Sequence, residues 1–115
     1  MEIKIVKNQI KLGELSEIAK NQFGDLVKAV VDVEQEIMAI GGELHSDEEV
    51  ALMEQDGSKR EDTWGINFYP EKTDQEFLEF DSVINIKPSF GNYSRGIDSQ
   101  EIREKIKNVV QKLVI

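Results

Sequence analysis

The 115-residue chain has no cysteine, a single histidine and only two prolines. Without cysteine it has no disulfide framework, no thiol nucleophile and no zinc ribbon. No apolar run reaches the roughly 18 residues that a membrane span needs, and no N-terminal stretch resembles a secretory signal. We therefore expect one domain over residues 1–115, located in the cytoplasm and without a membrane partner.

The sequence also lacks the motifs that hold common cofactors. Neither GxxxxGK[ST] nor GxGxxG occurs, so no nucleotide-binding loop is predicted. His45 and Asp47 invite a metal or acid–base interpretation, but two ligands are too few for a metal site. We expect neither a cofactor nor a bound metal.

Positive charge is scarce and unevenly spread. The formal net charge is −9, which argues against a nucleic-acid partner because phosphate contacts need a basic surface. Residues 1–83 hold 8 Lys+Arg against 20 Asp+Glu, whereas residues 84–115 hold 6 against 3. The modest basic end suits a small anion better than a duplex.

Hydrophobic periodicity and turn residues predict an α+β domain. The sheet is expected to be antiparallel or mixed, with four to five strands and two amphipathic helices on one face. The predicted order is β-α-β-β-α-β-β-α, with strands at 3–6, 26–34, 37–40, 63–69 and 78–87, and helices at 12–23, 46–56 and 98–114. Ser46 and Asp98 are the expected helix caps.

The last two predicted strands lie in the stretch 62–96, which carries most of the aromatic residues. Alternation puts Trp64, Ile66 and Phe68 on one face of the first strand, and we expect Trp64 and Phe68 to be buried beneath the last helix. In the second strand, the buried face is predicted to hold Leu78, Phe80, Ile84 and Ile86. The opposite face of both strands is polar, and it leads toward a glycine-rich loop at 89–96.

That polar face and loop supply a candidate ligand site. Lys87 and Arg95 are expected to converge on a small carboxylate or phosphate, helped by the backbone amides of residues 92–94. The candidate ligand-binding residues are Asn67, Tyr69, Asp81, Asn85, Lys87, Asn92, Ser94 and Arg95. The structural alternative is that Arg95 pairs with an acidic residue and braces the last helix.

Two other function classes stay open. Residues 43–62 hold 8 acidic and 2 basic residues, a predicted solvated face that would suit a basic partner in an antitoxin-like or regulatory role. An enzyme of hydrolase type would use Asp81 and His45 for acid–base work, with Arg95 holding an anionic substrate. No triad order or metal motif supports the enzyme, so we favour a binding module, and a homodimer is left open.

Several segments resemble a family of small prokaryotic proteins of unknown function. They are FGDLVKAVVD at 23–32, GGELH at 41–45, WGINFYP at 64–70 and INIKPSFGNYSR at 84–95. The resemblance covers nearly the whole chain and implies a stand-alone domain. It implies no activity and assigns no catalytic residue.

Overall fold

The computed structural model describes residues 2–115 and has an α+β fold of three helices and a five-stranded antiparallel sheet, which confirms the predicted class. The elements, in chain order, are β1 (Lys4–Val6), α1 (Leu12–Asn21), β2 (Val27–Asp32), β3 (Ile37–Ile40), α2 (His45–Asp56), β4 (Thr63–Phe68), β5 (Leu78–Glu79) and α3 (Gln100–Leu113). Short 3₁₀ turns occupy Arg60–Asp62, Asp74–Glu76, Val83–Asn85 and Pro88–Phe90.

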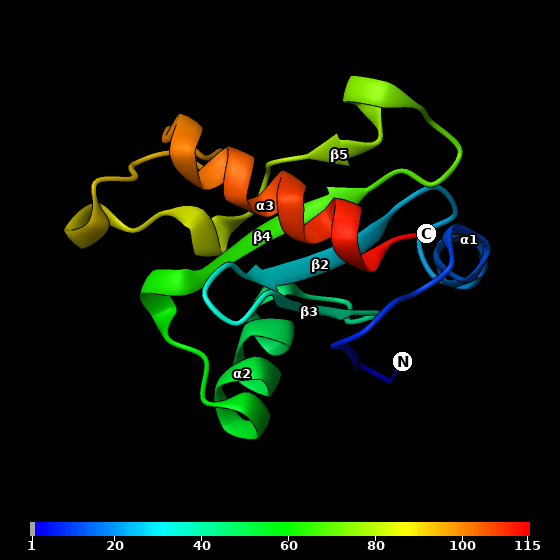
Figure 1. Cartoon of the computed structure of the whole chain (residues 1–115), viewed down its shortest axis with the longest axis horizontal. Helices are drawn as coiled ribbons and strands as arrows, with labels where there is room; N and C mark the ends of the chain where they lie inside the picture. Colours follow the sequence, from blue (N-terminus) through cyan, green and yellow to red (C-terminus); the bar gives the residue numbers. More distant parts are fainter. Residues whose placement is uncertain (1) are drawn as a thin grey trace.

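The strands lie in the order β1-β3-β2-β4-β5, so the apolar β2 is central and β1 is an edge. In the pairing of β2 with β4, Lys28 lies opposite Asn67 and Asp32 lies opposite Thr63. Figure 1 shows α3 running across β2 and β4. Both α1 and α3 contribute to the core on that face, while α2 packs against the other face.

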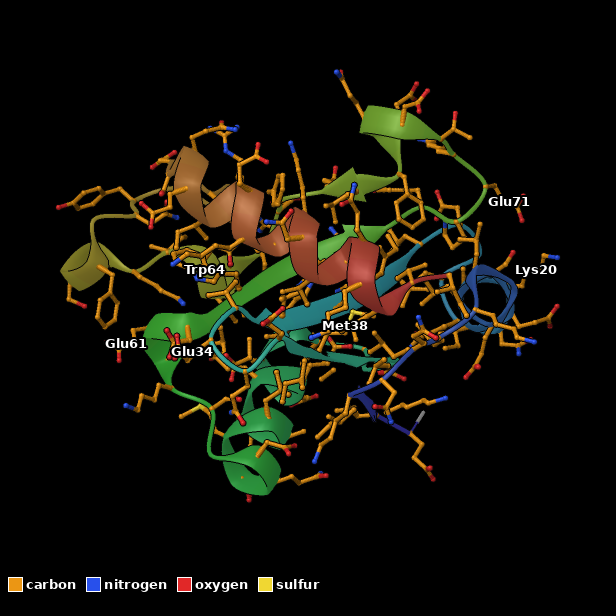
Figure 2. The ribbon with its side chains drawn as sticks, in the orientation of Figure 1. Lys20, Glu34, Met38, Glu61, Trp64 and Glu71 are labelled. Atoms are coloured by element: carbon orange, nitrogen blue, oxygen red, sulfur yellow. The ribbon has the colours of Figure 1, made fainter. Side chains whose placement is uncertain are left out.

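The core beneath α3 is built from apolar residues that recur at helical spacing along α3 and from alternate residues of β4. Ile106, Val109, Val110 and Leu113 of α3 join Trp64, Ile66 and Phe68 of β4. Trp64, labelled in Figure 2, is only 4 % exposed and Phe68 is fully buried. Their place in the core shared with α3 confirms the predicted register of β4. A register shifted by one residue would have put both rings on the opposite face.

The predicted strand at 78–87 is wrong beyond Glu79. The chain leaves the sheet after β5 and turns through Val83–Asn85. Ile84 packs on the α2 face with Leu52, while Ile86 is exposed, so the four expected apolar residues do not share a face. Side-chain hydrogen bonds take the place of the missing strand ladder, as described below.

The starts of α2 and α3 and the burial of the acidic segment 43–62 also differ from the prediction. The α2 helix begins at His45 rather than after a Ser46 cap, and Ser99, not Asp98, caps α3 by accepting a hydrogen bond from the Ile102 amide. Two acids of the expected solvated face, Glu48 and Glu49, are buried against the sheet. None of the helices within residues 2–115 is long and apolar enough to cross a membrane.

Candidate functional site

The segment 82–98 is fixed by a set of buried polar side chains, Ser82, Asn85, Lys87 and Asn92, which we call the polar network. The Asn85 amide pairs with the β4 backbone as a neighbouring strand would, accepting from Gly65 N at 2.8 Å and donating to Gly65 O at 2.9 Å. A side chain at position 65 would collide with Ser82, since a Cβ there would lie 2.5 Å from Ser82 Cβ. Glycine is therefore required for this close approach.

Lys87 is held inside the molecule rather than at a ligand site. Its side chain is buried, its ammonium donates to the carbonyl oxygens of Arg60 and Thr63, and it lies 3.9 Å from the centre of the Trp64 ring. Burial, aided by the neighbouring Arg60 guanidinium, lowers the pKa of Lys87 to about 8. These partners satisfy the ammonium from within the chain.

Asn92 organises the glycine-rich loop in a similar way. Its amide nitrogen donates to the carbonyls of Asn85, Ser94 and Gly96, and its oxygen accepts from the Asp98 amide at 2.9 Å. Ser94 is exposed and donates to Asp98 at 3.3 Å. The loop is therefore shaped by its own side chains and delivers the chain into α3.

The expected convergence of Lys87 and Arg95 is absent. Arg95 is exposed and pairs with Asp81 at 2.7 Å, as in the structural alternative, although the partner lies before the loop rather than in the last helix. Asn67 and Tyr69 both donate to Glu79, at 2.9 and 3.0 Å. All eight candidate ligand residues thus have partners inside the chain, and ligand binding by them stays a prediction.

His45 begins α2 and contacts β4. Its Nε2 lies 2.8 Å from the Ile66 carbonyl oxygen, so Nε2 carries the proton and donates. Burial lowers the pKa of His45, which favours the neutral ring. No direct hydrogen bond joins His45 to Asp81 within residues 2–115, and Asp81 is engaged by Arg95. The acid–base hypothesis therefore has no direct hydrogen bond between His45 and Asp81 through which a proton would pass.

A different region gathers like charges around a concave site of about 410 Å³, which we call the acidic cavity. Its walls come from the β2–β3 turn, the end of α2 and the segment that leads into β4. The lining residues are Asp32, Glu34, Gln35, Asp56, Gly57, Lys59, Glu61 and Asp62, five carboxylates against one ammonium. Figure 2 shows Glu34 and Glu61 beside each other on this side of the molecule.

The floor of the acidic cavity is rigid because Asp32 is fully engaged. Its carboxylate accepts from the backbone amides of Glu34 and Gln35, at 2.9 and 3.0 Å, and from the Ser58 hydroxyl at 2.6 Å. The Gln35 side-chain amide adds a bond to the same carboxylate and another to the Asp56 carbonyl. The turn and the end of α2 are thereby joined into one frame.

The other carboxylates of the acidic cavity have too few cations and hydrogen-bond donors around them. Desolvation, with help from the charges of Asp32, Glu61 and Glu34, raises the pKa of Asp62. The Asp56 side chain is 10 % exposed; its Oδ1 pairs with Lys7 at 2.6 Å, but its buried Oδ2 has no hydrogen-bond partner. A cationic group in the cavity would relieve this repulsion.

The comparison with known families gives one result, a family model described as "Protein of unknown function (DUF5674)" that matches residues 4–113. The chain belongs to this family. No curated protein and no solved structure matches it. Membership confirms the expected family of unknown function and adds no activity, so the function must be argued from the geometry.

Sequence reasoning missed the acidic cavity because three of its eight lining residues, including two of its five carboxylates, lie outside the acidic segment 43–62. Asp32 and Glu34 come from the end of β2 and the turn that follows it, about 30 positions before Glu61 and Asp62. The pairing of Asp32 with Thr63 brings the two groups together. The sequence signal was the acidic turn DVEQE at 32–36, which would have pointed to the site once the strand pairing was known.

Proposed function

We propose that the protein is a binding module that recognises a basic segment of a partner protein through the acidic cavity. The observation that supports this most is the gathering of five carboxylates and one ammonium around a single concave site. Opposite charges across an interface speed encounter and fix orientation. A guanidinium or ammonium from a partner would neutralise carboxylates that now repel each other.

The rigid floor of the cavity supports the same proposal. Asp32, Gln35 and Ser58 are locked by hydrogen bonds, so little side-chain entropy is lost there when a partner docks. Within residues 2–115, no three acidic or histidine side chains are arranged to hold a metal ion. An organic cation therefore fits the cavity better than a metal does.

Binding of a small anion has less support. It needs free cations near one another, whereas Lys87 is buried among carbonyls and Arg95 is paired with Asp81. An antitoxin-like or regulatory role is compatible with the acidic cavity, because the cavity would bind the basic surface of such a partner.

The test measures binding of an arginine-rich peptide by calorimetry. The double variant Glu34→Gln, Glu61→Gln should weaken binding about tenfold, because exposed charge pairs contribute up to about 1 kcal/mol each. The matched control Glu43→Gln, Glu54→Gln removes the same charge from exposed positions outside the cavity and should change affinity less than about twofold. Equal weakening by both variants would mean that only net charge matters, and the proposal would be wrong.

A further inference from the structure

A second concave site lies between α3 and the excursion that joins β4 to β5, away from the acidic cavity. We call it the apolar groove; it encloses about 510 Å³. Its lining residues are Asp74, Gln75, Phe77, Leu78, Phe80, Lys107, Val110 and Gln111. This volume lies in the range of small-molecule sites, which are mostly apolar with a few polar groups that fix orientation.

The apolar wall of the groove is held in place from within. The Phe77 ring packs on Phe68, with centroids 5.4 Å apart, and the Phe77 carbonyl accepts from the Tyr69 amide at 2.8 Å. The facing residue, Val110, is anchored in the core under α3. Both walls are therefore held by packing, and the connecting segment also by a backbone hydrogen bond, which favours a preformed groove.

The charges at the groove indicate the kind of ligand. Lys107 is half exposed, and its ion pair with Glu104 is long, at 3.8 Å. Such a pair contributes little, so the ammonium can turn to a ligand at small loss. Asp74 is the one carboxylate among the groove residues, and its backbone has φ of 55°. A ligand anion would thus be drawn toward Lys107 and away from Asp74.

We propose that the apolar groove binds a small carboxylic acid with an apolar body. The body packs between the Phe77 and Phe80 side of the groove and Val110, and the carboxylate pairs with Lys107. An adjoining site of about 390 Å³ shares Asp74, Phe77, Val110 and Gln111 and continues toward Val114 and Ile115, which gives room for a longer chain. This site is independent of the acidic cavity and of the function proposed for it.

The experiment titrates the protein with 3-phenylpropionate and with its neutral analogue 3-phenylpropanol, followed by amide chemical shifts. The carboxylate should bind more tightly than the alcohol, with shifts at Phe77, Phe80 and Val110. Lys107→Gln should remove most of this preference, a loss of about threefold to fivefold for the carboxylate and little change for the alcohol. Lys105→Gln, on the same helix but outside the groove, is the matched control and should keep it.

Asp74→Asn gives a test of opposite sign. Asparagine tolerates the left-handed backbone at this position, so the variant removes a like charge with little strain. Carboxylate binding should tighten, by about twofold. The proposal is overturned if neither compound shifts the groove amides, if the alcohol binds as well as the acid, or if Lys107→Gln leaves the preference intact. Equal binding of the alcohol would identify a purely apolar surface, of the kind that a protein partner covers.

Discussion

The polar network and the acidic cavity are both rich in side chains that bind ligands in other proteins, but they use them differently. In the polar network, none of the four residues has a buried polar atom without a partner. In the acidic cavity, Asp56 Oδ2 is buried without a partner, and desolvation together with the neighbouring carboxylates raises the pKa of Asp62. The side chains of the polar network form hydrogen bonds within the fold. The acidic cavity, in contrast, keeps carboxylates that have no cationic or hydrogen-bonding partner within residues 2–115.

The difference comes from the backbone that each region must support. After Glu79 the chain runs without a strand ladder to α3, so its carbonyls and amides need side-chain partners, which Asn85 and Asn92 supply. The acidic cavity sits on a regular hairpin whose backbone is already paired. Only the Asp32 carboxylate bonds to the backbone of the turn. The remaining carboxylates of the cavity are therefore available to a ligand.

The largest expected effect is in the polar network. Asn85→Ala removes three hydrogen bonds and leaves both Gly65 backbone groups buried without partners, so the free energy of unfolding should fall by about 3 kcal/mol or more. Urea unfolding measures this. Asn108→Ala, at an exposed position of α3, is the control and should change little. If both variants lose the same amount, Asn85 does not hold the segment.

A second expected effect concerns Glu48, a buried carboxyl of α2 that belongs neither to the polar network nor to the acidic cavity. Burial raises its pKa well above the ordinary value, and its one polar contact is the Gly42 amide at 3.0 Å. A raised folded-state pKa gives stability below the unfolded-state pKa that is lost as the pH rises through the folded-state pKa. Glu48→Gln should abolish this loss, so the free energy of unfolding at alkaline pH should rise by on the order of 1 kcal/mol relative to the natural protein.

The Glu48 variant is followed by thermal unfolding at pH values above neutral, where the lowered pKa of His45 keeps the ring neutral in the folded state. Glu54→Gln removes an exposed charge from the same helix and serves as the control. Parallel pH profiles for Glu48→Gln and the natural protein would show that Glu48 is ionised in the folded state without penalty.

A smaller effect is expected in the acidic cavity. Asp62 has a raised pKa, so its stabilising contribution is present below the ordinary aspartate pKa and is lost as the pH rises through the raised value. Asp62→Asn should therefore stabilise the protein at neutral pH, by only a few tenths of a kcal/mol because the group is partly exposed and solvent screens its charge. The gain should shrink in high salt, and a loss of stability would mean that the carboxylates do not repel each other.

The smallest effect is expected at Arg95. Its ion pair with Asp81 is exposed on both sides, so Arg95→Ala should lower the free energy of unfolding by less than about 0.5 kcal/mol. Chemical denaturation measures this difference. A loss as large as that of Asn85→Ala would place Arg95 within the polar network.

The parts of the fold with strong periodicity could be predicted from the sequence. The α3 stripe and the alternation of Trp64, Ile66 and Phe68 fixed which residues lie beneath α3. The strand beyond Glu79 could not be predicted, because Ile84 and Ile86 alternate like strand residues while the Asn85 side chain replaces the backbone ladder. Hydrophobic periodicity does not reveal where a side chain takes the place of a neighbouring strand.

The polar residues illustrate the limit of residue type as a guide to function. Lys87 and Asn92 have the chemistry of anion binding, yet burial and internal carbonyls decide how they are used. Conversely, Glu48 and Glu49 look like a solvated surface in the sequence, but α2 turns them toward the sheet. Whether a polar residue is free depends on tertiary packing, which a single sequence does not specify.

The most direct test of the comparison is a chemical-shift titration of the natural protein with an arginine-rich peptide. We predict that the amides of residues 32–36 and 56–62 shift with a common affinity that weakens in high salt, while residues 82–98 do not shift. That result would show that the acidic cavity binds and that the polar network is structural. Shifts centred on residues 82–98, or spread over every acidic surface of the molecule, would contradict it.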